Sequence, residues 1–218
     1  MYGHHFDSDT RTVLTLLDIS GIDYEFKEVD IFKGEHQDVK YLAMNPVGSI
    51  PMIIDQDCQL MGTPNVFVNY LASKPKLQSY MPKVHAAKID QTMNWFLSVV
   101  RPCMARLIKA LVGPKAFGFE EPTGEEIEAA KEEFFDDILV RINDQLANRQ
   151  FMIAKNEPTV IDIIFYNELS TALLLTRFKG YKKRFPNFRQ WITLMAEIAE
   201  LGEQEEKLCS ILDSYNLE

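Results

Sequence analysis

The chain changes character once, near residues 74–83, and that change limits the folds open to it. In residues 1–73, short apolar runs alternate with polar turns. Beyond residue 83, apolar residues recur at three- and four-residue spacing, the pattern of amphipathic helices. The segment between holds Pro75, Pro82 and several lysines, which is typical of a linker. The sequence therefore predicts a small α/β domain over 1–73, a linker over 74–83 and an all-helical domain over 84–218.

The first domain is expected to run β-α-β-α-β-β-α. Residues 11–19 carry a helical stripe that ends at Ser20-Gly21, because glycine accepts the left-handed geometry of a helix C-terminus. The remaining elements are strands over 24–29, 49–55 and 58–61, and a helix that starts at Thr63-Pro64.

The second domain is expected to contain four helices. The first is long, with apolar residues spaced from Ile89 to Leu111, and Gly113-Pro114 is expected to stop it. The others are expected over 123–148, after Pro158-Thr159, and over 187–201.

Composition excludes several classes of protein. The net charge of −9 repels phosphate backbones and argues against nucleic-acid binding. The sequence has no apolar run long enough for a membrane span and no secretory signal, so a cytoplasmic location is expected. The cysteines Cys58, Cys103 and Cys209 are widely spaced and are read as reduced thiols. No metal site is expected, because adjacent histidines such as His4 and His5 point to opposite faces of a strand.

The most specific local signal is the run Asn45-Pro46-Val47-Gly48-Ser49-Ile50-Pro51. A proline just before a strand can hold a cis peptide, which costs an X–Pro bond only about 0.5–1 kcal/mol. The plain alternative is a turn into a strand. The run resembles the N-P-x-G-x-[VI]-P segment of glutathione transferases. In that family the cis turn exposes the backbone of the preceding residue, here Ile50, to the cysteinyl backbone of glutathione.

Four further segments resemble the same family, in the same order along the chain. They are the theta-class-like run Val29 to His36, the helix with Trp95, Arg101 and Arg106, the box Pro158-Thr159-Val160-Ile161-Asp162, and the run Phe185 to Trp191. The resemblance implies a thioredoxin-like α/β N-terminal domain followed by an all-α C-terminal bundle. It also implies glutathione as co-substrate, a hydrophobic small molecule as second substrate, and either a homodimer or a place in a larger protein complex.

The residue that would activate the thiol departs from the family pattern. Theta-like members place a serine four residues before an arginine of the first helix, and counting back from Arg11 gives Asp7. A carboxylate there would oppose a thiolate by like-charge repulsion. The neighbouring Ser8 is therefore the candidate catalytic hydroxyl, and Thr10 is a weaker one. The alternative for Ser8 is a helix cap.

The site for the γ-glutamyl end of glutathione also departs from the pattern. The family has Glu-Ser before its third helix, and this chain has Thr63-Pro64. Proline supplies neither a hydroxyl nor an N–H, so two donors are lost, each worth about 1.5–3 kcal/mol to a charged group. The plain alternative for Thr63-Pro64 is a helix N-cap with its first residue.

The resemblance assigns the rest of the glutathione site to residues that match family positions. His36 and Gln37 would lie near the glycyl end, with a surface histidine as the alternative for His36. Ser49 stands where theta-type members have lysine, and Ile50 and Pro51 form the turn. Arg101 would face the sulfur, where its charge would favour thiolate, with a surface ion pair as the alternative. An apolar electrophile would sit near Val100, Met104 and Phe117.

Two functions remain open on this reasoning. The first is a theta-like transferase that conjugates glutathione thiolate to an apolar electrophile. The second is a non-catalytic scaffold or assembly subunit that kept the fold. The loss of the Glu-Ser pair favours the scaffold, and the presence of His36 and Arg101 favours the enzyme. A membrane form, like the chloride-channel relatives of the fold, is not expected. This chain lacks the apolar span and the cysteine that such a form requires.

Overall fold

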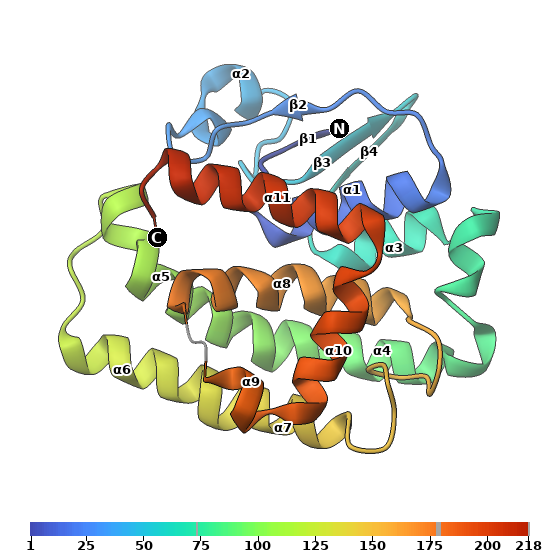
Figure 1. Ribbon diagram of the computed structural model, residues 1–218. Coiled ribbons are helices and arrows are strands. Elements are labelled where there is room, and N and C mark those ends of the chain that lie inside the picture. Colours follow the sequence, from blue (N-terminus) through green and yellow to red (C-terminus); the bar gives the residue numbers. More distant parts are fainter. Residues whose placement is uncertain (73, 178–179, 218) are drawn as a thin grey trace.

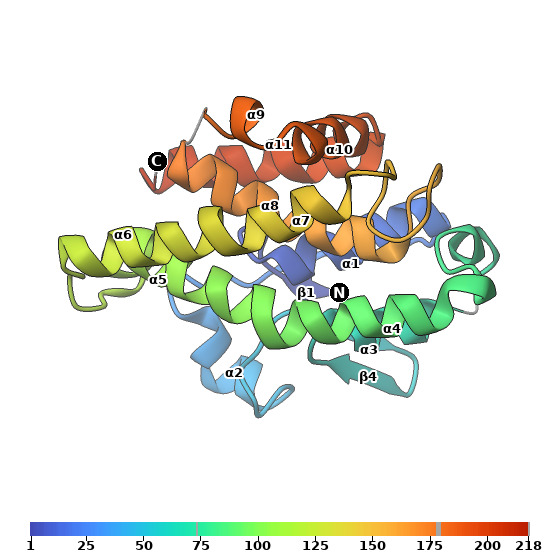
Figure 2. The same ribbon diagram turned by 90° about the horizontal axis from the view of Figure 1, so that it is seen from below.

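The computed structural model describes residues 1–72, 74–177 and 180–217. The predicted domain ends at Ser73 and Glu218 lie outside those residues. Figure 1 shows a sheet with one short helix, α2 (Val39–Leu42), on one side and helices α1 (Ser8–Ser20) and α3 (Pro64–Leu71) on the other. Most helices of the second half form a layer beyond α1 and α3, while the last long helix, α11 (Ala199–Ser214), lies beside α1 (Figures 1 and 2). This arrangement confirms the predicted α/β domain followed by an all-helical one.

The sheet has four short strands in the order β2-β1-β3-β4. Strand β1 pairs parallel with β2 and antiparallel with β3, and β3 forms a hairpin with β4. Their bounds are β1 (Tyr2–Gly3), β2 (Lys27–Glu28), β3 (Met52–Asp55) and β4 (Cys58–Met61). The predicted element order is confirmed, while β2 and β3 are shorter than the strands expected over 24–29 and 49–55.

Helix α1 begins at Ser8, so the residue that caps it is the one before, Asp7. Asp7 is the N-cap, and its carboxylate accepts the backbone N–H of Thr10 at 2.7 Å. The suggestion that Ser8 caps the helix is therefore wrong, because Ser8 already lies in the first turn. At the other end Gly21 adopts the expected left-handed geometry.

The first long helix of the second half runs further than predicted. It comprises α4 (Ala86–Trp95), a π-helical turn over Phe96–Val100, and α5 (Arg101–Phe117). The prediction that Gly113-Pro114 stops it is wrong. Pro114 lies in the last turn, and Gly118, at φ 65°, is the residue that ends the helix. The N–H groups of Gly118 and Phe119 then satisfy the carbonyls of Pro114 and Gly113.

The other helices follow the predicted order, with one correction near the C-terminus. The helix expected over 187–201 is two helices, because Ile198 is extended and starts a new one. No glycine or proline marks that break. The helices are α6 (Gly124–Glu132), a π-helical segment over Glu133–Ile138, α7 (Leu139–Gln145), α8 (Val160–Thr176), α9 (Tyr181–Arg184), α10 (Pro186–Ala196) and α11 (Ala199–Ser214).

The start of α8 is held by one buried carboxylate, as the sequence predicts. Asp162 accepts the backbone N–H of Thr159 at 2.8 Å, the N–H of Met152 at 2.7 Å and the indole N–H of Trp191 at 2.9 Å. The Thr159 hydroxyl also donates to Asp162, at 2.9 Å. Helix α8 is thereby fixed as the buried centre of the bundle, where it contacts α1, α5 and α11.

Within the described ranges, none of the helices combines the length and apolar character that a membrane span needs.

Candidate functional site

The loop before β3 has the geometry predicted for it. The Ile50–Pro51 peptide bond is cis. The Ser49 carbonyl is fixed by the Tyr41 hydroxyl and by the Asn45 side-chain amide, each at 2.7 Å. Within the described part of the chain, no other backbone group pairs with the N–H or the carbonyl of Ile50. The loop therefore offers one donor and one acceptor from a rigid turn.

His36 and Gln37 lie beside this loop, in a 3₁₀ turn over Glu35–Gln37. The Gln37 side-chain amide is 3.5 Å from the Gly48 carbonyl. Nδ1 of His36 is buried and has no hydrogen-bond partner among the described residues. The structure thus brings together five of the predicted residues, His36, Gln37, Ser49, Ile50 and Pro51.

The predicted γ-glutamyl end lies at the start of α3. Thr63 is the N-cap and Pro64 the first helical residue, as the plain alternative predicts. The Thr63 hydroxyl donates to the Asn65 side chain. Sequence reasoning missed Asn65, whose backbone N–H has no partner in the described residues and points from the open first turn. The start of α3 therefore keeps a backbone donor at Asn65, one residue after Pro64.

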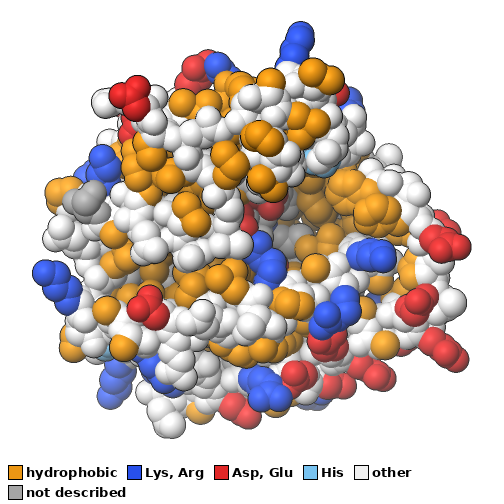
Figure 3. Space-filling model, turned by 180° about the vertical axis from the view of Figure 1, so that it is seen from behind, with side chains coloured by type: hydrophobic (Ala, Val, Ile, Leu, Met, Phe, Trp, Pro, Cys, Tyr) orange, Lys and Arg blue, Asp and Glu red, His pale blue; other side chains and the backbone are white. Residues whose placement is uncertain are grey.

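A cavity of about 300 Å³ lies where the two domains meet. The face of the molecule in Figure 3 is hollowed, with hydrophobic side chains around the hollow and charged ones within it. The predicted catalytic pair, Ser8 and Arg101, both line the cavity. Its other lining residues are Phe6, Asp7, Ile31, Ala105, Ile108, Lys109, Phe117, Phe119, Glu168 and Thr171.

The apolar wall of this cavity differs in part from the predicted one. Phe117 lines it as expected and stacks with Phe119 at a centroid distance of 5.6 Å. Val100 and Met104 do not, because both are fully buried in the helical core. They belong to the core face of the π turn and of α5, so the prediction that they contact the electrophile is wrong.

The Ser8 hydroxyl is hydrogen-bonded to a carboxylate. It donates a hydrogen bond to Oε2 of Glu168, a residue of α8 that also lines the cavity. The Glu168 side chain is only 4% exposed. Burial raises the pKa of Glu168, and the nearby Asp9 carboxylate raises it further, against the opposing effect of Arg101.

Arg101 is paired with two carboxylates. Its guanidinium donates to both oxygens of Asp9, at 2.7 and 2.5 Å, and lies 3.4 Å from Glu168. The pair is largely buried, since Asp9 is 7% and Arg101 27% exposed. Arg101 is thus in an ion pair, as the alternative predicts, but at the domain junction rather than on a helix surface.

Asp7 and Glu168 are the two carboxylates among the described residues that line the cavity. Burial raises the pKa of Asp7, and the charge of Asp9 adds to that rise. Burial raises the pKa of Tyr41, and the charge of Asp7 raises it too.

Sequence reasoning missed Glu168 and Asp9 as parts of this site. Asp9 was visible only as a residue of the first helix, and Glu168 only as a polar residue in a buried helical run. Neither residue belongs to a motif, so the sequence did not indicate that they contact Arg101. Among the described residues, no group of three acidic, histidine or cysteine side chains is arranged to hold a metal ion.

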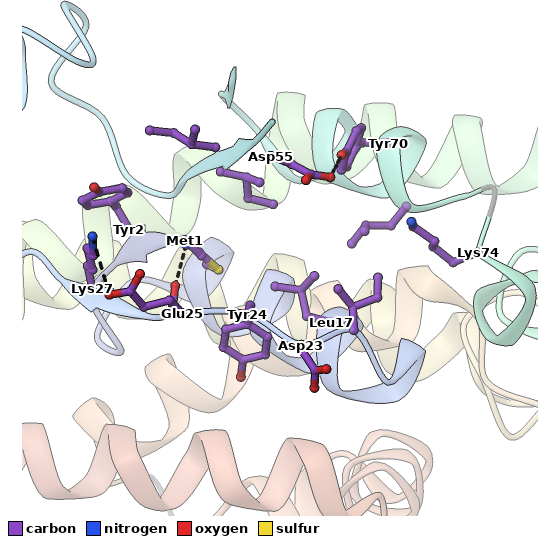
Figure 4. A pocket seen from close by; sticks show the side chains of 14 residues that line it. Met1, Tyr2, Leu17, Asp23, Tyr24, Glu25, Lys27, Asp55, Tyr70 and Lys74 are labelled. Atoms are coloured by element: carbon purple, nitrogen blue, oxygen red, sulfur yellow. Dashed lines mark hydrogen bonds and ion pairs between the residues drawn. The ribbon is translucent and has the colours of Figure 1, made fainter. Parts of the chain in front are cut away.

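A larger hollow, of about 390 Å³, lies elsewhere (Figure 4). It is lined by the ends of α1 and α3, by Tyr24 and Glu25 before β2, and by Ile54 and Asp55 at the end of β3. Asp55 accepts the Tyr70 hydroxyl there. Because this is the end of β3 opposite Pro51, the hollow contains none of the predicted site residues.

Sequence comparison matches residues 1–73 to the family model described as glutathione S-transferase, N-terminal domain. Glutathione S-transferase F9 of Arabidopsis thaliana is 37% identical over 78 residues, which cover 36% of this chain and 35% of that protein. Glutathione S-transferase hmp2 of Hypomyces subiculosus is 26% identical over 191 residues, covering 85% of this chain and 88% of that protein. The chain thus spans about a third of the first relative and most of the second.

The fold has close counterparts among solved structures. The chain matches human glutathione transferase theta-2, in complex with glutathione and an unknown ligand, with a TM-score of 0.85. That match is 21% identical in sequence and covers 99% of this chain and 89% of the other. Together with the cis-proline loop, these matches lead to one conclusion: the chain has the glutathione-transferase fold, and its residues 1–73 match the N-terminal domain of glutathione S-transferases.

Proposed function

We propose that the protein is a theta-type glutathione transferase that conjugates the glutathione thiolate to an apolar, aromatic electrophile. The observation that carries the proposal is the cavity at the domain junction, where Ser8 and Arg101 meet an aromatic wall. The open backbone of Ile50 in the cis-proline loop supports it. Solved relatives described as holding glutathione or lactoylglutathione support glutathione as the co-substrate.

Glutathione would lie along the cis-proline loop. Its cysteinyl backbone would pair with the N–H and carbonyl of Ile50, and its glycyl carboxylate would approach His36 and Gln37. Nδ1 of His36 supports this placement, because a buried nitrogen without a partner is available to a ligand. The γ-glutamyl carboxylate would reach Thr63 and the N–H of Asn65 at the start of α3.

The electrophile would occupy the aromatic side of the cavity. Phe6, Phe117 and Phe119 line it, and Phe32 contacts both Phe6 and Phe117 with centroid distances of 5.1 and 5.4 Å. Aromatic side chains pack best against flat apolar groups, which supports an aromatic electrophile.

Two measurements test the proposal: retention on immobilised glutathione, and conjugation of chlorodinitrobenzene. We expect the wild type to be retained and to turn over. The Ser8→Ala variant should keep its retention but lose about 100-fold in kcat/KM, the usual effect of removing one hydrogen-bonding group at a developing charge. Ser210→Ala is the matched control, since Ser210 is exposed and its hydroxyl bonds the Glu206 carbonyl of its own helix. Turnover that Ser8→Ala leaves intact would contradict the proposed role of Ser8.

A non-catalytic scaffold is the second candidate, and Pro64 supports it. Proline at the first position of α3 removes a hydroxyl and an N–H that a carboxylate would use. The acidic partners of Arg101 support it too, because they neutralise the charge that would favour thiolate. No retention by immobilised glutathione, together with partner proteins that co-purify with the chain, would favour this function. Under either function we propose a cytoplasmic protein that forms a homodimer or joins a complex.

A further inference from the structure

Glu168 occupies a position from which it controls the only proton of the Ser8 hydroxyl. The carboxylate is almost wholly buried, lines the cavity, and accepts the Ser8 hydrogen bond on Oε2. A hydroxyl carries one proton and two acceptor lone pairs. While Glu168 is ionised, Ser8 can therefore accept a hydrogen bond from a group in the cavity but has no proton left to donate to it.

This arrangement matters for a thiol bound beside Ser8. A thiol can donate its proton to the Ser8 oxygen, whereas a thiolate needs Ser8 to donate. The two states of the sulfur thus require opposite orientations of the Ser8 hydrogen bond, and the orientation follows the protonation of Glu168.

The charges around Glu168 suit a group that gains and loses a proton. The first turn of α1 and its cap present Asp7, Asp9 and Arg11, and α5 presents Arg101. Glu205 of α11 acts on Arg11 instead, and its carboxylate accepts the Tyr166 hydroxyl. Because Asp9 already binds Arg101 with both oxygens, the guanidinium stays paired when Glu168 is neutral. Burial also raises the pKa of Glu168, which brings it nearer to that of a thiol.

We propose that Glu168 accepts the thiol proton of bound glutathione through Ser8. The thiol proton passes to the Ser8 oxygen as the Ser8 proton passes to Oε2 of Glu168. The S–H bond and the Ser8 O–H bond break, and a new O–H bond forms on each oxygen. At the end Glu168 is neutral and donates to Ser8, Ser8 donates to the sulfur, and the negative charge has moved from the carboxylate to the thiolate.

The inference rests on the proposed glutathione transferase function, and it makes a prediction that this function alone does not make. A thiolate that forms by simple ionisation releases one proton to solvent. A thiolate that forms through Glu168 keeps that proton inside the protein.

The first test counts protons on the wild type. Glutathione is titrated into the protein at about pH 6.5, some two units below the pKa of a cysteine thiol. Calorimetry in buffers of different ionisation enthalpy gives the protons released, and ultraviolet absorbance gives the thiolate formed. A parallel titration with S-methylglutathione, which has no thiol proton, measures the protons released by all other linked groups. We expect glutathione to form thiolate and to release no more protons than S-methylglutathione does.

The second test uses Glu168→Gln, which keeps the shape and offers Ser8 an amide N–H in place of the carboxylic acid. In this variant each thiolate should release one proton, and thiolate should form only at higher pH. The kcat/KM for chlorodinitrobenzene should fall about 100-fold near neutral pH, the usual contribution of a general base. The loss should shrink as pH approaches the thiol pKa, whereas a purely structural loss would persist at all pH values.

Glu205→Gln is the matched control, because Glu205 also accepts a hydroxyl hydrogen bond but does not line the cavity. It should leave the proton count and the pH profile unchanged. The inference is overturned if the wild type releases one proton per thiolate, or if Glu168→Gln keeps the wild-type proton count. If Glu168→Gln does not fold, the number of protons that the wild type releases per thiolate still tests the inference.

The two failures can be told apart. If glutathione does not bind, the proposed function fails and the relay fails with it. If glutathione binds and forms a thiolate whose proton reaches the solvent, only the relay through Glu168 is wrong.

Discussion

At the scale of the residue, burial at the junction of the two domains shifts the pKa of several titratable groups and so favours one of their protonation states. His5 is an example. Its Nδ1 lies 3.2 Å from the Gln204 side-chain oxygen, and its ring packs on Phe26 at a centroid distance of 4.9 Å. Burial lowers the pKa of His5 to about 4, and the charge of Lys207 lowers it too. The folded protein therefore holds His5 neutral where an unfolded chain would protonate it.

This shift predicts a pH dependence of stability. Between pH 6.5, the ordinary pKa of histidine, and about 4, the unfolded state binds the proton and the folded state does not. The contribution of His5 to stability is therefore complete above pH 6.5 and is lost as pH falls towards 4. We expect His5→Asn to destabilise the protein more at pH 7.5 than at pH 5, as measured by urea unfolding. A difference between the two proteins that does not change with pH would contradict this account.

At the scale of the element, helix ends follow local backbone geometry more than helix propensity. Gly118 and Gly202 illustrate the point, because an added Cβ would meet no atom within 4 Å at either position. They differ in conformation. Gly118 ends α5 at a φ of 65°, whereas Gly202 lies within α11.

The two glycines should respond to alanine with opposite signs. Gly118→Ala should lower the free energy of unfolding by about 1–2 kcal/mol, the cost of left-handed backbone for a residue with a Cβ. Gly202→Ala should raise it by about 0.5–1 kcal/mol, because alanine loses less backbone entropy in a helix. Each variant is the control for the other in thermal or urea unfolding. Equal effects of the two substitutions would contradict the account based on φ.

At the scale of the whole molecule, Arg11 connects the two domains. It is fully buried in α1. Its guanidinium donates to the carbonyls of His5 and Phe6, at 2.6 and 2.8 Å, within the α/β domain. It also donates to the Asn167 carbonyl and, at 2.6 Å, to the Thr171 hydroxyl of α8. One side chain thus satisfies buried acceptors from both domains.

Arg11→Met, which removes the donors and keeps an unbranched side chain, should cost at least about 3 kcal/mol, since several buried acceptors lose their partner. Urea unfolding followed by tryptophan fluorescence reports the helical domain, which contains Trp95 and Trp191. Far-ultraviolet circular dichroism reports the whole chain. We expect both transitions to move together to lower urea. Arg106→Met is the control, because the Arg106–Glu133 pair is exposed and such pairs contribute about 0–1 kcal/mol. A loss below that of the control would contradict the role of Arg11.

Much of the fold could be predicted because its signals are local. The cis turn at Pro51, the carboxylate of Asp162 at the start of α8, and the glycine at the end of α1 each depend on residues a few positions apart. The break before α11 could not be predicted, because no residue at Ile198 disfavours a helix. The loop half of the candidate site, Ser8 and Arg101 were likewise visible in the sequence, while their acidic partners Glu168 and Asp9 were not.

The sequence by itself determined the order of elements, the change from an α/β to a helical domain, and the shape of the loop at Ile50. Only the tertiary structure decided which groups Ser8 and Arg101 bind, since their partners lie 160 and 92 residues away in the chain. The physical reason is that the packing of α1, α5 and α8 buries these side chains together. Burial then sets which groups pair and which hold a proton, and no local pattern encodes that outcome.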